Sequence, residues 1–579
     1  MASIRTAGAL SRPAHRAARR PLRWTTLAFL APLIVYLLLF YAYPLYRNIE
    51  LSLHDYTPRA FIQGNPEFTG LENYATILSD DAFLHALGNT ALFTLGSIAV
   101  QYALGLALAV FFHRSFRLSA VLRAMFLVPW LLPLIVSAST WSWMLNSDNG
   151  IVNAALQAFG IGQINWLTSP DTSLLAVTIA NIWLGVPFNL VILYAGLQNI
   201  PATLYEAAGL DGANGWQRFW RITFPLLRPV SAITLLLGLI YTLKVVDIIW
   251  IMTRAARPTP PRPWRSGPTG RRSAPGSPTS PRGGGRQPAH PHRLRRRARA
   301  RAPAARGGAD MRTWWKTALG IVLVAVMLFP VYWMVNVSLT RTSDMRADPP
   351  HWFPWNPTFE GYAAAFGQQL PALATSLFIG LGTVVLTLAV SLPAGYALAK
   401  LRPRGGRAID FLLLVAQMIP AVVMAMGFYA IYIRLGLLNT VPGLIVADST
   451  LAVPFGVLLF RAFMAGIPGE LLSAAQIDGA TTWRTFRSII LPLSRNSVIT
   501  VSLFTFLWAW SDFIFASTLN RNSDVIPITL GIFRYIGNNT TQWNSIMATA
   551  VIASIPAAFL LILAQRYIAA GVTAGAVKD

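Results

Sequence analysis

One short segment with a carboxylate, small residues and a glycine occurs twice in this chain. The first copy comprises Glu206, Ala207, Ala208, Asp211, Gly212, Ala213, Phe219, Ile222 and Pro225. The second comprises Ser473, Ala474, Ala475, Asp478, Gly479, Ala480, Phe486, Ile489 and Pro492, each 267 positions later. Small side chains beside an acidic residue suit docking into a partner protein. Because one offset holds over the whole stretch, we interpret the copies as one binding device used twice.

Each copy is predicted to form a short helix, a glycine break and a second helix. The paired alanines leave a narrow helical surface that can enter a cleft, and Gly212 permits a backbone conformation that other residues resist. Trp216, Phe219 and Ile222 lie at i, i+3 and i+6 and are expected to anchor the segment, which Pro225 is expected to end. A helix lying on lipid headgroups has similar features, but the exact repetition favours docking.

The repeated segment resembles the EAA loop of the permease subunits of bacterial ABC importers, in particular the carbohydrate-uptake branch that includes the maltose importer. The resemblance implies that each copy is a coupling helix that docks into a nucleotide-binding subunit and transmits its closure to the membrane helices. Ser473 stands where the first copy has Glu206, so a charged contact is expected in the first half only. Glu470, one turn earlier, is a weak substitute.

A possible substrate-binding face occupies the fourth apolar segment. Asn181, Leu184, Gly185 and Phe188 fall at i, i+3, i+4 and i+7 and share one helical face. An amide binds a sugar hydroxyl, glycine leaves room, and an aromatic ring lies against a sugar ring. The spacing alone is equally compatible with helix packing through Asn181 and Gly185.

The carbohydrate-permease resemblance favours the substrate interpretation, because this face lines the sugar site of the maltose importer. The resemblance also implies that Gly238 and Thr242, on the next apolar segment, line the substrate site. Both lack the amide of a maltose-type pocket, which leaves the sugar open.

The sequence indicates no catalytic residues, metal site or cofactor in this chain. A Walker A loop holds phosphates with Gly-x-x-x-x-Gly-Lys-Ser/Thr, which does not occur here. ATP and Mg²⁺ are therefore expected on separate ATPase subunits. The seven histidines are scattered, and cysteine is absent.

Ionisable residues within apolar segments are a second set of candidate functional residues, because burying an unpaired charge in a membrane span costs free energy. Lys244 and Asp247, at i and i+3, are expected to pair with each other. Asp448 is the second-half equivalent of Asn181 and is a candidate for the translocation path. Asp512 lies near the end of another apolar segment.

The composition predicts an all-α polytopic membrane protein. Apolar residues make up 54% of the chain and charged residues 12%, and apolar runs long enough to cross a bilayer recur. The predicted spans are 24–46, 87–112, 119–144, 174–197 and 229–252, then 317–339, 372–399, 409–433, 441–464, 497–520 and 544–568. The first half therefore has five spans and the second half six.

Charge in the short loops predicts the orientation, because cytoplasmic loops retain lysine and arginine. The basic leader 1–23, which carries no signal-peptide cleavage site, is placed inside. The acidic loop 47–86 is placed outside and the basic loop 113–123 inside. Arginines in both repeated segments place these in the cytoplasm, where an ATPase can reach them.

The segment 254–310 differs from the rest of the chain. It holds fifteen arginines against one acidic residue and no apolar run. A crossing is nevertheless needed, because the fifth span ends outside and the basic residues after Met311 place the second half's start inside. A disordered linker that binds acidic lipid or nucleic acid is one interpretation. We favour a frameshift in GC-rich DNA near Arg254, which joined two permease genes and deleted a sixth span.

The predicted organisation is a leader (1–23), a first permease module (24–253), the junction (254–310) and a second module (311–579). The predicted function is the permease of an ATP-driven importer in the bacterial inner membrane, moving a sugar or polyol derivative by alternating access. Its expected partners are an ABC ATPase dimer, an extracytoplasmic solute-binding protein, the sugar and membrane lipid, with no nucleic acid. An ion-coupled secondary transporter is the alternative, and a membrane-anchored binder of nucleic acid or acidic lipid is a remote third.

Overall fold

The computed structural model describes residues 24–55, 66–255, 314–347, 350–522, 525–538 and 542–576. The predicted leader and nearly all of the predicted junction lie outside the described residues. Apart from one hairpin of β1 (His54–Asp55) and β2 (Glu67–Phe68), paired antiparallel, the regular structure in the described part is helical. The predicted all-α class is confirmed.

The first half contains α1 (Trp24–Leu37), η1 (Leu38–Ala42), α2 (Tyr43–Ser52), α4 (Glu72–Ser79), α5 (Asp81–His113), α6 (Ser119–Phe126), α7 (Val128–Leu131), α8 (Leu134–Met144), α9 (Ile151–Ala158), α10 (Pro170–Gln198), α11 (Ala202–Leu210), α12 (Gly215–Arg218), η2 (Phe219–Thr223), α13 (Phe224–Leu243) and α14 (Asp247–Ala255). The second half contains α15 (Trp314–Ser338), η3 (Asp344–Arg346), α16 (Glu360–Tyr396), η4 (Ala397–Leu401), α17 (Gly406–Met418), α18 (Ala421–Leu435), α19 (Val441–Ala465), α20 (Gly469–Ile477), α21 (Thr482–Thr485), η5 (Phe486–Ile490), α22 (Leu491–Leu493), α23 (Arg495–Ser511), α24 (Ile514–Leu519), α25 (Ile528–Asn538) and α26 (Trp543–Ala576).

Eight helices in the described part are long and apolar enough to cross a membrane, and three bent pairs raise the number to 11 if each pair is one span. Five of these precede the junction and six follow it, as predicted. Two of the bends lie at Pro133 and Pro420, which precede α8 and α18 and favour an extended preceding residue. The predicted fifth span, 229–252, is interrupted: α13 ends at Leu243 and the short α14 begins at Asp247.

Each half is built around one tightly packed pair of long helices, α5 with α10 and α16 with α19. A Cβ placed on Gly105 of α5 would lie 2.4 Å from the Cβ of Asn189 on α10. A Cβ on Gly456 of α19 would lie 2.9 Å from the hydroxyl of Ser391 on α16. Small residues therefore allow these helices to approach closely, as membrane helices commonly do.

The first helix of each half packs against the other half. Tyr36 of α1 shares a 2.6 Å hydrogen bond with the hydroxyl of Ser449 on α19. In the reverse direction, the indole of Trp183 on α10 donates to the carbonyl of Met327 on α15 at 2.8 Å. The two main hydrophobic core clusters accordingly contain side chains from both halves.

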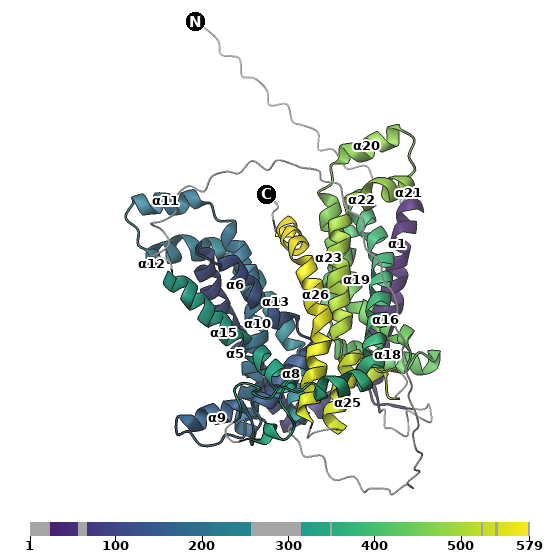
Figure 1. The fold of residues 1–579 in the computed structure, drawn as a ribbon. Coiled ribbons are helices and arrows are strands. Elements are labelled where there is room, and N and C mark those ends of the chain that lie inside the picture. Colours follow the sequence, from purple (N-terminus) through teal and green to yellow (C-terminus); the bar gives the residue numbers. More distant parts are fainter. Residues whose placement is uncertain are drawn as a thin grey trace, which may run out of the picture.

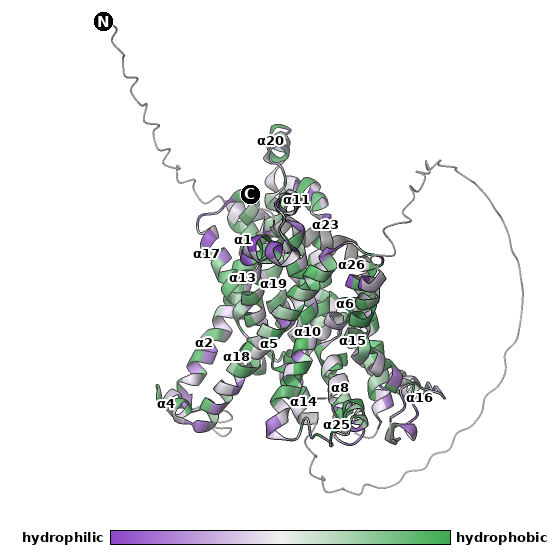
Figure 2. Ribbon diagram, turned by 90° about the vertical axis from the view of Figure 1, so that its left-hand side faces the viewer, coloured by the Kyte–Doolittle hydropathy of each residue, from purple (hydrophilic) through white to green (hydrophobic). Residues whose placement is uncertain are grey.

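The two halves meet near α8 and α25 and lie apart at the other end, which carries α11, α12, α20 and α21 (Figure 1). Apolar residues follow the helical shafts and polar residues gather near their ends (Figure 2). The short α14 lies at the same end as α8 and α25 (Figure 2). Thr317 of α15, by contrast, donates to the carbonyl of Arg117 in the predicted cytoplasmic loop. The described chain thus stops at one end of the bundle and resumes at the other.

The last helix of the second half, α26, packs against an apolar face of α23. The equivalent face of α13 in the first half is exposed. Leu503, Phe506 and Trp510 of α23 are 6%, 6% and 2% exposed, and the indole of Trp510 donates to Ala553 of α26. Their equivalents in α13, at the same offset of 267 positions, are Leu236, Leu239 and Leu243, exposed by 56%, 37% and 52%. Among the described residues, no helix occupies the matching position beside α13.

Candidate functional site

The repeated segments form two loops of matching geometry at the end where the halves separate. We call them coupling loop 1 (202–225) and coupling loop 2 (469–492). Gly212 and Gly479, which follow α11 and α20, have φ of +76° and +75°. In loop 1 the amide of Ala213 donates to Ala208 at 2.9 Å, and in loop 2 that of Ala480 donates to Ala475 at 2.8 Å. This is the Schellman arrangement, in which glycine ends a helix, so the predicted helix, glycine break and helix are present in both copies.

An apolar side chain projects from the tip of each loop, next to the aspartate. Leu210 is 92% exposed and Ile477, its equivalent, is 85% exposed. Their immediate neighbours, Asp211 and Asp478, are exposed as well. The sequence analysis did not identify these two residues, although an apolar residue directly before the repeated Asp-Gly pair was a visible signal in both copies. Equivalent apolar side chains are therefore exposed at the tips of both loops.

The predicted anchor of loop 1 is partly wrong. Phe219 and Ile222 are half-buried, but Trp216 is 71% exposed and its ring lies beside those of Phe219 and Trp220 in its own loop. In loop 2 Phe486 is buried, with its ring centroid 5.3 Å from that of Phe29 on α1. The second loop is therefore held by a helix from the other half, a contact that helical spacing does not reveal.

The predicted ending at Pro225 is also wrong. The amide of Phe224 donates to Phe219, five residues back, so a π-helical turn joins the loop to α13. Leu491 makes the same bond to Phe486 in loop 2. Proline is tolerated in the first turn of the following helix, where its missing N–H needs no partner. Movement of either loop is thus connected directly to a spanning helix.

The acidic residues of the loops face solvent in this structure. Glu206 and Glu470 are exposed, and neither forms an ion pair within the described part of the chain. Ser473, which replaces the first glutamate, donates to the carbonyl of Gly469 at 3.3 Å. The hydroxyl is thus used inside its own helix, while both glutamates remain accessible to a partner.

The polar part of the predicted substrate face packs against α5. The amide of Gln101 donates to the backbone carbonyl of Asn181 at 2.9 Å. The side-chain amide carbon of Gln101 would lie 2.2 Å from a Cβ placed on Gly185. Gln101 therefore fills the space that glycine leaves, in agreement with the helix-packing alternative for Gly185. The side-chain nitrogen of Asn181 is buried without a hydrogen-bond partner.

The aromatic part of the face is open on one side. Phe188 contacts the ring of Tyr241 on α13 at a centroid distance of 5.6 Å. Phe455 and Trp508 stand at the equivalent positions of the second half, 4.9 Å apart. All but Tyr241 are half-buried, Tyr241 is exposed, and none of the four belongs to the two main core clusters.

The remaining candidates lie on the same two helices, α10 and α13. Leu184 packs against the first core cluster. Gly238 and Thr242 are buried positions of α13 that flank Tyr241 in sequence. Tyr241 itself was missed by the sequence analysis, because an aromatic residue in an apolar span carries no distinguishing signal.

The predicted pairing of Lys244 with Asp247 is wrong. The ammonium of Lys244 donates to the carbonyl of Gln417 at 2.9 Å, across the boundary between the halves. One carboxylate oxygen of Asp247 and one of Asp448 are buried without a hydrogen-bond partner. Asp512 instead accepts from the amides of Phe515 and Ala516, in the first turn of α24.

The described residues contain no cluster of metal-ligating side chains. The arrangement as a whole consists of two matching exposed loops at one end of a helical bundle and buried amide, carboxyl and aromatic groups between the spans. This suits a protein that couples an external partner to movements of membrane helices.

Comparison with known families agrees with this description. The family described as "Binding-protein-dependent transport system inner membrane component" matches residues 101–253 and 391–574, more than half of the chain. The chain belongs to this family. It is a multi-pass inner membrane permease, the transport component of a binding-protein-dependent system.

Individual relatives are carbohydrate permeases. The trehalose/maltose transport system permease protein MalF of Thermococcus litoralis is 40% identical over 223 residues, covering 38% of this chain and 74% of that protein. The diacetylchitobiose uptake system permease protein DasC of Streptomyces coelicolor is 33% identical over 269 residues, 46% of this chain and 96% of that protein. A solved bacterial ABC transporter involved in alginate import aligns with a TM-score of 0.40 and 20% identity, over 46% of this chain and 99% of that chain.

Proposed function

We propose that this chain carries both permease modules of an ATP-driven importer for a carbohydrate. The observation that carries the proposal is the pair of coupling loops, which have the same hydrogen bonds and the same positive-φ glycine at an offset of 267 positions. The names of the relatives, trehalose/maltose and diacetylchitobiose permeases, support a carbohydrate as the substrate.

In the proposed mechanism each coupling loop binds one subunit of an ABC ATPase dimer, which holds ATP and Mg²⁺. The exposed Leu210 and Ile477 enter apolar clefts on these subunits, and the acidic residues bind around them. Closure of the ATPase dimer brings the separated ends of the two halves together. Because a π-helical turn joins each loop to a span, this closure reorients the helices around the substrate, which is alternating access.

The substrate path is proposed to run between the two halves, along α10, α13, α19 and α23. Phe188 and the residues around it form the sugar-binding face of the first half, with Asn181 supplying its unpartnered amide nitrogen. The contact of Gln101 with Gly185 must open for that amide to reach a sugar. An extracytoplasmic solute-binding protein delivers the sugar at the end that carries α8 and α25.

We also propose that the first module has lost its sixth span to a frameshift near Arg254. Two observations support this: the described chain stops and resumes at opposite ends of the bundle, and the face of α13 at Leu236, Leu239 and Leu243 lacks the cover that α26 gives to α23. On this proposal the first module of the chain is one span short.

The test is reconstitution into proteoliposomes with the ATPase and solute-binding protein encoded by the neighbouring genes, using a version with the sixth span restored. Sugar uptake should require internal ATP and the binding protein and should ignore an imposed ion gradient. Uptake driven by an ion gradient without the ATPase would instead support a secondary transporter.

A further inference from the structure

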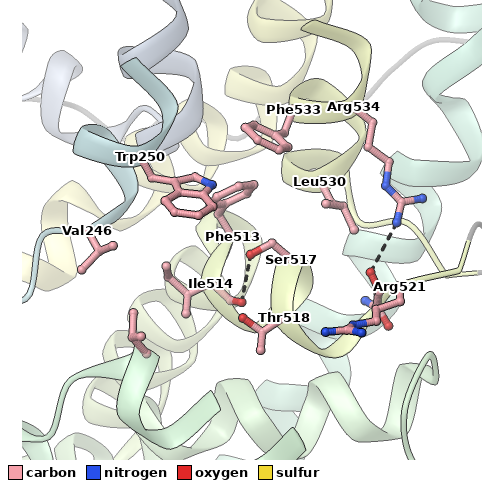
Figure 3. Close-up of a pocket in the computed structure, with 12 residues that line it drawn as sticks. Val246, Trp250, Phe513, Ile514, Ser517, Thr518, Arg521, Leu530, Phe533 and Arg534 are labelled. Carbon is pink, nitrogen blue, oxygen red and sulfur yellow. Dashed lines mark hydrogen bonds between the residues drawn. The ribbon is translucent and has the colours of Figure 1, made fainter. Parts of the chain in front are cut away.

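A cavity of about 600 Å³ lies between the two halves, away from the coupling loops. The first half contributes Val246 and Trp250, and the second half contributes Val422 of α18 together with α24, α25 and their flanking residues (Figure 3). The volume is in the range of small-molecule sites. Because α14 and α25 lie at the end opposite the loops (Figure 2), the cavity is on the side from which an imported solute arrives.

The cavity has an aromatic side and a cationic side. Phe513 and Phe533 meet edge to face at a centroid distance of 4.9 Å, and the indole of Trp250 lies on the same side (Figure 3). The guanidinium groups of Arg521 and Arg534 lie on the other side (Figure 3). None of the lining residues is acidic, and neither arginine forms an ion pair within the described part of the chain.

Asn520, which is also a lining residue of the cavity, has an unsatisfied side chain. It is 2% exposed, yet both its side-chain oxygen and its side-chain nitrogen lack a hydrogen-bond partner. Leaving a buried amide unpaired is costly. Both atoms are shielded, so the side chain must first turn toward the cavity; a ligand with adjacent hydroxyl groups then satisfies both, since one hydroxyl accepts from the nitrogen and another donates to the oxygen.

The cationic wall is fixed before any ligand binds. Arg534 donates to the carbonyls of Asn520 and Asn522 at 3.3 and 3.2 Å. Arg521 lies over the ring of Tyr429, 4.9 Å from its centroid. The side-chain oxygen of Asn439 accepts from the backbone amides of Arg521 and Asn522 at 2.7 and 3.0 Å. Such preorganisation lowers the entropic cost of binding.

We infer that this cavity is an entry subsite for an acidic saccharide, a sugar that carries a carboxylate or another anionic group. The aromatic side stacks on the sugar ring, Asn520 binds a pair of hydroxyls, and the two arginines bind the anionic group. The inference rests on the proposed carbohydrate function and adds a charge preference and a second binding position to it. An anionic lipid headgroup is a rival occupant with the same charge.

The test is a binding measurement on the purified full chain in phosphatidylcholine nanodiscs, which requires no transport. Calorimetric titrations compare digalacturonate with its carboxyl-reduced neutral form. The neutral disaccharide should bind at least tenfold more weakly, and Arg534→Gln and Asn520→Leu should each weaken digalacturonate binding at least tenfold. The control is Arg434→Gln, an exposed arginine that does not line the cavity and should leave binding unchanged.

A second readout separates a binding role of Asn520 from a structural one. Because its amide has no partner to lose, Asn520→Leu should keep or raise the melting temperature while it weakens binding. Equal affinities for the two disaccharides, or a variant that loses binding only by unfolding, would overturn the inference. So would loss of digalacturonate binding when phosphatidylglycerol is added, since a lipid would then be the occupant.

Failure of this inference and failure of the proposed function give different results. If only the subsite is wrong, ATP-driven sugar uptake persists without a preference for acidic sugars. If the importer function is wrong, uptake is absent although digalacturonate still binds the cavity.

Discussion

Replacing Gly212 with valine should uncouple the first loop from the ATPase through backbone strain alone. A Cβ at this position would meet nothing within 4 Å, so the side chain itself creates no clash. The backbone has φ of +76°, where an L-residue costs roughly 1–2 kcal/mol. That cost lowers the population of the docking conformation by about 5- to 30-fold. Because valine is β-branched, we expect its effect at the upper end of this fold range.

The assay is binding of the purified ATPase to the permease, followed by sugar-dependent ATP hydrolysis. Gly212→Val should weaken ATPase binding by about 5- to 30-fold and reduce transport, while the protein remains in the membrane. Gly479→Val should act in the same way on loop 2. Gly215→Val is the matched control, because it is an exposed glycine of the same loop with no positive φ and no neighbour within 4 Å. Equal behaviour of Gly212→Val and Gly215→Val would refute the argument.

Three further predictions follow from the site and the junction. Asn181→Ala should reduce transport but leave ATPase assembly intact; joint loss of both would support the packing role instead. Leu210→Asp should weaken ATPase binding at least tenfold, because burying a charge in an apolar cleft is costly, and sugar binding should not change; unaltered ATPase binding would exclude Leu210 from the interface. A shifted reading of the DNA near Arg254 should encode an apolar run of about twenty residues ending close to Met311; if no frame does, the segment is a true linker.

The features predicted correctly from the sequence were those carried by local repetition. The spans follow from long apolar runs, and the two loops follow from an alanine helix and a glycine at a constant offset. The positive φ of Gly212 was implied by its residue type, because glycine is the residue that adopts this conformation readily. These properties depend on near neighbours in the chain.

The features that were missed depend on distant contacts. No pattern within α10 shows that Gln101 of α5 fills the space at Gly185, or that Lys244 bonds to Gln417 and not to Asp247. Phe486 of loop 2 is buried against Phe29 of α1, a helix from the other half, whereas its equivalent in loop 1, Phe219, is only half-buried. The exchange of first helices between the halves, which causes this difference, leaves no periodic signal.

The central claim, that both loops dock onto an ATPase, is tested most directly by cross-linking. The chain contains no cysteine, so Leu210→Cys and Ile477→Cys each introduce a single thiol at a loop tip. With a thiol-reactive photo-cross-linker, both variants should form an adduct with the ATPase, and a cysteine at the exposed Leu78 of α4, on the predicted outer side, should form none. Absence of an adduct from both loop tips, in a protein that still imports sugar, would contradict the account.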